Sequence, residues 1–153
     1  MICYNKVMGK VSEIGICKNK GDKILKVNHV EAVASKGLIN DRKYKENNPK
    51  LSQITLIEIE NVNHFNKVSN ITIPSLNFRR NIITEKIKLN DLVGKDFFVG
   101  NVKLRAHDLC RPCKYLGDLL SQNNFVKALL HRGGIRCEIL LSGTINTGDK
   151  INL

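Results

Sequence analysis

The segment 107–116, HDLCRPCKYL, contains the residues whose types and spacing are best suited to chemistry. Cys113 follows Pro112 and lies between the cationic residues Arg111 and Lys114. Adjacent positive charge favours the thiolate form of a cysteine, which is both the reactive nucleophile and the soft metal ligand. Cys113 is therefore the first candidate for a catalytic or metal-binding residue.

Cys110 precedes Cys113 by three residues, a spacing that also suits a disulfide, a pair of metal ligands, or a resolving thiol. A structural zinc site needs four ligands, and this run offers these two cysteines and His107. The chain has no second CxxC pair. A thioredoxin-like centre would require a parallel βαβ framework, whereas the surrounding pattern is antiparallel. Cys113 as a reactive thiolate or as a ligand of a catalytic metal is therefore favoured over a structural zinc site and over a thioredoxin-like disulfide centre.

The composition is typical of one soluble domain. A chain of 153 residues can bury one sizeable core, so residues 1–153 are predicted to form a single domain. No stretch approaches the roughly 20 apolar residues of a membrane helix, and the N-terminus does not resemble a signal peptide. We expect a cytoplasmic protein whose five cysteines are reduced. Cys3 and Cys17 have no partners in the sequence and are interpreted as structural.

The chain carries 25 basic and 14 acidic residues, for a net charge of +11. Such a surface attracts anions at long range. Like charges do not form a block, only 5% of residues are aromatic, and none is Trp. A small anionic ligand is therefore favoured over nucleic acid as the partner.

Short runs of alternating apolar and polar residues predict a mainly β chain. The expected strands are a hairpin of 11–17 with 24–34, a strand at 53–59, one at 81–84 after a break at Pro74, a hairpin turning near Gly100 and Asn101, and two or three closing strands from residue 135. Helices are expected at 59–67, with Phe65 inward, and at 125–130, with Gly133 as a C-terminal cap. The sum predicts a closed or partly closed barrel of mostly antiparallel strands with one or two short helices.

Two further groups of residues could meet a ligand. Asp41 and Arg42 follow a glycine-containing turn, where the carboxylate can hold the backbone while the guanidinium reaches a ligand; an internal ion pair between loop residues is the alternative. If Arg79 and Arg80 lie on a strand, they point to opposite faces, so one faces the site and Asn81 shares the face of Arg79.

Five motifs follow one another along the chain: GLINDRKY (37–44), RRNI (79–82), RPCKYL (111–116), HRGG (131–134) and SGTINTGD (142–149). Their order and approximate spacing resemble those of the MOSC domain, which is named after the C-terminal part of molybdenum cofactor sulfurases. From about Gly9 to Leu153 the chain resembles a stand-alone member of this family. Asn40 stands where the family usually has Gly, and Asn tolerates a positive φ better than other side chains. The resemblance implies a β-barrel.

The resemblance also implies a molybdopterin cofactor whose phosphate is gripped by fork-shaped donors beside Cys113. The predicted cofactor-binding residues are Arg42, Arg79, Arg80, Asn81, Arg111, Lys114, His131 and Arg132. His131 and Arg132 have an alternative role, which is to complement the C-terminal dipole of the predicted helix.

The resemblance implies two chemistries for Cys113, and the sequence does not separate them. As a persulfide, it would carry sulfur from a PLP-dependent cysteine desulfurase to a metal cofactor or molybdoenzyme. As a molybdenum ligand, it would serve a reductase of N-hydroxylated compounds supplied with electrons by a separate protein. A non-catalytic module that binds an anionic phosphorylated ligand is the third interpretation. The chain offers no convincing lysine setting for PLP, which would therefore belong to a partner.

Overall fold

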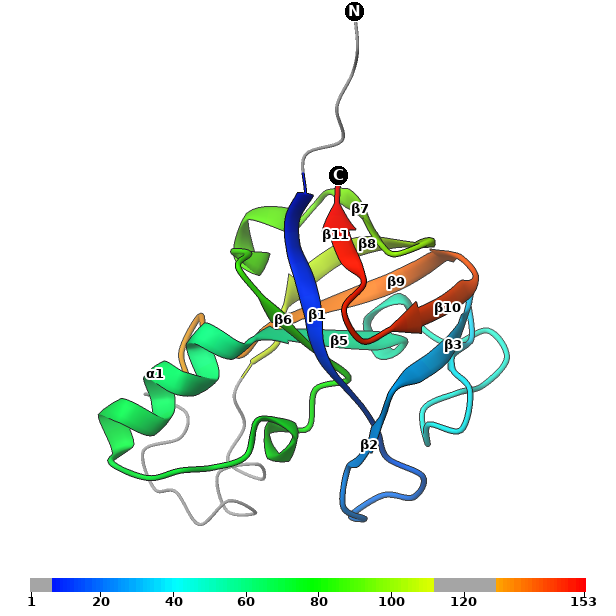
Figure 1. Ribbon diagram of the computed structural model, residues 1–153. Helices are drawn as coiled ribbons and strands as arrows, with labels where there is room; N and C mark the ends of the chain where they lie inside the picture. The colour runs from blue at the N-terminus through cyan, green and yellow to red at the C-terminus, as the bar shows by residue number, and fades with distance from the viewer. Residues whose placement is uncertain (1–6, 112–128) are drawn as a thin grey trace, which may run out of the picture.

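A closed seven-stranded β-barrel forms the centre of the computed structural model, which describes residues 7–111 and 129–153 (Figure 1). Its strands, in the order of their hydrogen bonding, are β11 (Lys150–Asn152), β7 (Asp96–Val99), β8 (Val102–Leu109), β9 (Ile135–Leu141), β5 (Ile54–Glu58), β6 (Ile82–Glu85) and β1 (Val7–Ile16). Pairing of β11 with β1 closes the barrel, and β2 (Leu25–Val27) extends it beside β1. Closure satisfies the backbone groups that open sheet edges would expose.

A smaller sheet lies beside the barrel and consists of β10 (Gly143–Asn146), β3 (His29–Val33) and β4 (Gly37–Leu38). Val30 and Ala32 of β3 are buried and belong to the same apolar cluster as the barrel interior. The segment 24–34 is therefore two strands in two sheets rather than the single strand predicted, because β3 turns its apolar face onto the barrel and pairs with β10.

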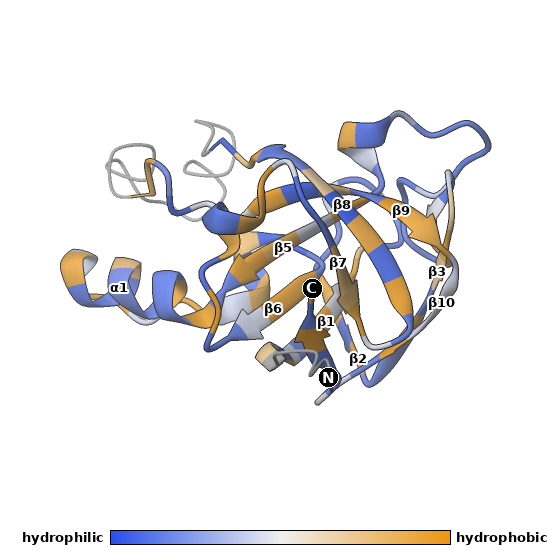
Figure 2. Ribbon diagram, turned by 90° about the horizontal axis from the view of Figure 1, so that it is seen from above, coloured by the Kyte–Doolittle hydropathy of each residue, from blue (hydrophilic) through white to orange (hydrophobic). Residues whose placement is uncertain are grey.

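The helix α1 (Ile59–Ser69) connects β5 to β6, which pair in parallel, whereas the other pairings among the described strands are antiparallel. A parallel pair needs such a crossover. Phe65 is 1% exposed and meets Phe78 edge to face, with ring centroids 5.4 Å apart. This second apolar cluster fixes α1 against the barrel, whose strands carry most of the hydrophobic residues (Figure 2).

Short 3₁₀ helices fill three connections: η1 (Lys50–Ser52), η2 (Ser75–Phe78) and η3 (Leu89–Leu92). No helix in the described part of the chain has the length and apolar character that crossing a membrane would require.

The structure confirms the mainly β barrel, the hairpin of β1 and β2, the helix with Phe65 inward, and the hairpin of β7 and β8. Pro74 precedes η2, so the predicted break before β6 is also confirmed. The helix expected at 125–130 begins outside the described residues and stays a prediction.

Gly134 provides a test of this packing. Its φ is +92°, and an added Cβ would lie 1.9 Å from the carbonyl oxygen of Leu56 in β5. Gly134→Ala is expected to lose at least about 3 kcal/mol of unfolding free energy, because backbone must move away from backbone. Gly148→Ala is the matched control, since φ is +90° there but no atom lies within 4 Å. It should lose about 1–2 kcal/mol from strain alone. Urea unfolding measures both, and equal losses would contradict the packing argument.

Candidate functional site

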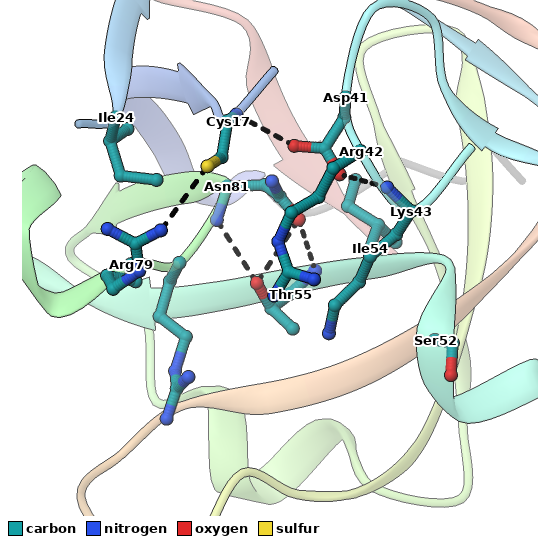
Figure 3. Close-up of a pocket in the computed structure, with 11 residues that line it drawn as sticks. Cys17, Ile24, Asp41, Arg42, Lys43, Ser52, Ile54, Thr55, Arg79 and Asn81 are labelled. Carbon is teal, nitrogen blue, oxygen red and sulfur yellow. Dashed lines mark hydrogen bonds between the residues drawn. The ribbon is translucent and has the colours of Figure 1, made fainter. Parts of the chain in front are cut away.

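A pocket of about 180 Å³ lies where several segments of the chain meet (Figure 3). These segments are the end of β1, the turn before β2, the loop after β4, η1 with the start of β5, and the turn between η2 and β6. We call it the basic pocket; its lining residues are Cys17, Ile24, Asp41, Arg42, Lys43, Ser52, Ile54, Thr55, Arg79, Arg80 and Asn81. The pocket thus brings together four of the residues predicted to bind the cofactor, namely Arg42, Arg79, Arg80 and Asn81.

Asp41 fixes the loop that carries Arg42 and Lys43. Its Oδ1 accepts a hydrogen bond from the backbone N of Cys17 at 2.9 Å, and its Oδ2 accepts one from the backbone N of Lys43 at 3.2 Å. The backbone N of Arg42 in turn donates to the carbonyl of Cys17 at 2.7 Å. The predicted backbone-holding role of Asp41 is confirmed, and the described structure contains no ion pair between Asp41 and Arg42. Asn40, which stands where the family usually has Gly, has a positive φ of +72°, a conformation that Asn tolerates better than other side chains.

Arg79 and Arg80 both line the pocket. The prediction that they point to opposite faces applied only to a strand, and they do not lie on one, because β6 begins at Ile82 and Arg79 is the left-handed C-cap of η2, with φ of +64°. The Arg79 guanidinium donates to the carbonyl of Asp22 at 3.0 Å and to Cys17 Sγ at 3.3 Å. Arg80 donates through Nε to the carbonyl of Gly133 at 2.9 Å.

Asn81 joins three segments at the floor of the pocket. Its Oδ1 accepts hydrogen bonds from the backbone N and the hydroxyl of Thr55, at 3.1 and 3.2 Å. Its Nδ2 donates to the carbonyl of Gly15 at 3.2 Å. These contacts make Asn81 a positioning residue, and its predicted contact with a ligand stays a prediction.

The pocket contains four cationic side chains, those of Arg42, Lys43, Arg79 and Arg80. None of them has a carboxylate within ion-pair distance among the described residues. Partial desolvation lowers the pKa of Lys43, and the positive charges of Arg42, Arg136 and Arg80 lower it further, against the opposing effect of Asp41. Arg136 lies on β9 opposite Thr55. Lys43 and Arg136 were not predicted to belong to the site; the direct succession of Lys43 after Arg42 was the available signal.

Cys17 was interpreted from the sequence as structural, yet it also lines the basic pocket. The residue is 4% exposed, and its Sγ donates to the carbonyl of Asn19 at 2.9 Å while accepting from Arg79. Its backbone binds the loop of Asp41, so it does have a structural role. The sequence carried no sign of its place beside the arginines, which depends on contacts across 62 residues.

The segment that leads to Cys113 passes close to Arg80. Cys110 is 3% exposed, and its backbone N donates to the carbonyl of Gly134 at 2.7 Å. A Cβ on Gly133 would lie 2.9 Å from the carbonyl oxygen of Cys110 and 3.7 Å from Arg80 Nη2. Arg111 is exposed. Cys113 and Lys114 lie outside the described residues.

His131 and Arg132 line a separate hollow together with Glu58 rather than the basic pocket. Asn90 Nδ2 donates to the carbonyl of His131 at 2.8 Å and holds this segment against η3. The structure therefore does not bring these two side chains to the four cations, and their predicted contact with the same ligand stays a prediction.

His107, the third ligand of the zinc alternative, is 2.8 Å from Glu138 Oε1 through Nε2. Within the described ranges, His, Cys, Asp and Glu side chains form no group of three that would hold a metal ion. Cys137 is buried, and burial raises the pKa of its thiol, with a further contribution from Cys110.

Comparison with known proteins assigns the chain to a family. The model of the MOSC domain matches residues 43–152, so the chain belongs to the MOSC domain family, which is associated with the molybdenum cofactor. Among solved structures, the YuaD protein from Bacillus subtilis is 18% identical with a TM-score of 0.83, and the alignment covers 97% of each chain.

Two YiiM structures share the fold at lower coverage of their own chains. YiiM from Geobacillus stearothermophilus is 17% identical with a TM-score of 0.77, over 95% of this chain and 74% of that one. YiiM from Escherichia coli is 14% identical with a TM-score of 0.68, over 96% and 68%. No curated protein matches the sequence significantly.

Replacement of Asp41 tests its role as the anchor of the cationic loop. Asp41→Ala leaves the backbone N–H groups of Cys17 and Lys43 without their acceptor and is expected to lose about 1–3 kcal/mol of stability. The control is Glu46→Ala, which removes an exposed ion pair with Lys36 and should change stability by less than about 0.5 kcal/mol. Urea unfolding measures both variants. A change at Asp41 no larger than that at Glu46 would refute the anchoring role.

Lys43 gives a prediction with a defined pH dependence. Because its pKa is lowered in the folded state, protonation of Lys43 disfavours folding at neutral pH, and this penalty disappears as the pH rises through the ordinary lysine value of 10.5. Lys43→Gln should therefore raise the melting temperature of the ligand-free protein at pH 7, and the gain should shrink towards pH 10.5. Thermal unfolding across this range measures it; a less stable variant at pH 7 would contradict the repulsion.

Proposed function

We propose that this chain binds a molybdopterin cofactor through the basic pocket and carries sulfur as a Cys113 persulfide for transfer to the metal centre. The observation that carries this proposal is the convergence of Arg42, Lys43, Arg79 and Arg80 without a carboxylate partner in the described structure. Uncompensated like charges in one pocket repel each other, and a bound phosphate would remove that cost.

The residues present fit the phosphate end of such a cofactor. The guanidinium of Arg42 makes no hydrogen bond or ion pair with the described residues, and Arg80 is held through Nε alone. Their terminal nitrogens are thus free to donate, and planar guanidinium groups bind phosphate oxygens in pairs. A cavity of about 180 Å³ admits a phosphate-sized group but does not enclose a pterin ring system. The pterin would extend beyond the pocket.

The short sequence distance between Cys110 and Cys113 supports a position of Cys113 near this phosphate. Cys110 is fixed to Gly134, and Gly133 is fixed to Arg80. Three residues of extended chain span at most about 11 Å, so Cys113 cannot lie further than that from the anchored Cys110. The cofactor, when bound, would supply the molybdenum to which sulfur is delivered.

In the proposed transfer, the Cys113 thiolate attacks the outer sulfur of a persulfide on a partner desulfurase. The sulfur–sulfur bond in the donor breaks, the donor cysteine leaves as a thiolate, and Cys113 becomes the persulfide. Arg111 and Lys114, which flank Cys113 in the sequence, would stabilise the anionic forms. PLP would belong to the desulfurase, and the Cys113 persulfide is the form in which this chain would present sulfur to the cofactor.

The deciding experiment purifies wild-type and Cys113→Ser protein without oxygen from a host that makes molybdopterin. Molybdenum, oxidised pterin and cysteine-bound sulfur are then assayed in each sample. The proposal expects pterin in both proteins and a persulfide only in the wild type. Loss of metal and pterin from Cys113→Ser would instead make Cys113 a molybdenum ligand and favour the reductase of N-hydroxylated compounds. Absence of persulfide and cofactor from the wild type would contradict the proposal and favour the third interpretation, a non-catalytic module that binds phosphorylated ligands.

The pocket itself is tested separately with inorganic pyrophosphate as the probe. Arg42→Gln is expected to weaken pyrophosphate binding about tenfold, because a charge-assisted hydrogen bond contributes roughly 1.5–3 kcal/mol. The control is Arg105→Gln, which removes a guanidinium of β8 that pairs with Asp96 outside the pocket. It should change binding less than twofold at physiological salt. Isothermal titration measures both, and equal effects would show that net charge rather than the pocket binds the probe.

A further inference from the structure

Glu58 presents a buried carboxyl oxygen without a partner. The residue is the last of β5 and the N-cap of α1, and it is 7% exposed. Its Oε1 is fully buried and has no hydrogen-bond partner among the described residues. A buried polar atom in this state costs free energy, so native proteins rarely retain one without a ligand, a water molecule or a function to account for it.

The Glu58 side chain lines a hollow of about 520 Å³ together with His131 and Arg132, which directly precede the Gly133 that Arg80 contacts. We call it the Glu58 pocket. Its walls come from the start of α1, from η3 and from the residues before β9, which the hydrogen bond from Asn90 to the carbonyl of His131 ties together. None of its lining residues lines the basic pocket.

The Glu58 pocket offers both signs of charge at different places. Glu58 and Asp91 supply carboxyl groups, whereas Lys88, Arg132 and, when protonated, His131 supply positive charge. Within the described residues, Lys88 and Arg132 have no carboxylate at ion-pair distance. A ligand that complements this arrangement must carry a hydrogen-bond donor for the buried carboxyl and an anionic group for the cations.

The location is also suited to a ligand. Glu58 lies at the carboxyl end of β5, which pairs in parallel with β6, and ligands of α/β units bind beyond the carboxyl ends of parallel strands. The first turn of α1 begins there, and no side chain caps it, so its positive end faces the same region. Both features favour a ligand with a carboxylate at the rim.

We propose that the Glu58 pocket binds a small zwitterion of the α-amino-acid type, whose ammonium donates to Glu58 Oε1 and whose carboxylate is held by Lys88 and Arg132. The proposal is independent of the basic pocket and of the chemistry at Cys113. It assigns a ligand to the orphaned oxygen and to the two unpaired cations at once.

The test follows the full-length protein by NMR during titration with L-alanine, a zwitterion without a further functional group. L-alanine in the millimolar range is expected to shift the backbone amides of residues 58–61, 88–91 and 130–132 and to move the titration of the Glu58 carboxyl to lower pH, because an ammonium stabilises the carboxylate. Methylammonium and acetate, which each carry half of the charge pattern, should bind at least tenfold more weakly. Equal binding of methylammonium would overturn the zwitterion, and absence of shifts with L-alanine would overturn the site.

Matched variants separate the Glu58 pocket from general surface charge. Glu58→Gln should weaken L-alanine binding at least tenfold, whereas Glu60→Gln, which changes an exposed carboxyl two residues further on, should change it less than twofold. Lys88→Gln should weaken binding severalfold, with Lys86→Gln as its control. Unchanged binding in both Glu58→Gln and Lys88→Gln would refute the proposal.

The thermal stability of Glu58→Gln shows whether the variant is folded. Burial raises the pKa of Glu58 and the nearby Glu60 carboxylate adds to the rise, against the opposing effect of hydrogen bonds to the carboxyl from the backbone of Glu58 and Leu89 and from the Asn61 side chain. The ionised carboxyl therefore disfavours the folded state, and stability falls as the pH rises through the folded pKa. Glu58→Gln should accordingly unfold at an equal or higher temperature than the wild type at pH 7, with the difference lost below the ordinary glutamate value of 4.5. A binding loss in this folded variant is then a loss of the contact itself.

Discussion

The turn at Gly133 and Gly134 is the constraint on which the rest of the site depends. Gly134 lies so close to β5 that a Cβ would meet the carbonyl of Leu56 at 1.9 Å, and its own carbonyl accepts a hydrogen bond from Cys110. Gly133 accepts from Arg80. One turn therefore fixes the start of β9, the segment leading to Cys113, and an arginine of the basic pocket. Any side chain at Gly134 would disturb all three, since the atoms it meets belong to backbone.

The basic pocket shows how a cluster of like charges can oppose stability. Asp41 is the carboxylate closest in sequence to Arg42 and Lys43, yet its two oxygens accept hydrogen bonds from the backbone N–H groups of Cys17 and Lys43. The arginines and the lysine are thus held in place by backbone contacts and remain electrostatically uncompensated in the described structure. Such an arrangement costs stability in the ligand-free protein and is offset when an anion binds. The lowered pKa of Lys43 has the same origin, in desolvation and neighbouring positive charge.

Local patterns predicted most of the fold because strands, turns and the amphipathic helix depend on neighbouring residues. The inward position of Phe65 followed from helical spacing, and the turn of β7 into β8 followed from Gly100 and Asn101. One error came from a long-range contact: the segment 24–34 divides between sheets because β10, more than 100 residues later, pairs with β3. Arg79 and Arg80 do not lie on a strand that would have pointed them to opposite faces, because a left-handed residue at Arg79 ends η2, and both line the pocket. The resemblance to the MOSC family brought Arg42, Arg79 and Arg80 together in advance, and Lys43 could have been added because it directly follows Arg42. Cys17 and Arg136 depend on tertiary packing that no local pattern encodes.

The separation of His131 and Arg132 from the basic pocket limits what a ligand of that pocket can be. Their motif suggested that both would join the arginines around one large anion, but His131 and Arg132 line the Glu58 pocket, whereas Arg80 lines the basic pocket and bonds to the carbonyl of Gly133. A phosphate group in the basic pocket would therefore be held from the loop of Arg42 and from the turn before β6. A carboxyl as buried as that of Glu58 would be unfavourable beside a phosphate, since both are anionic. The two pockets share no lining residue, so the buried carboxyl of Glu58 does not oppose an anion in the basic pocket.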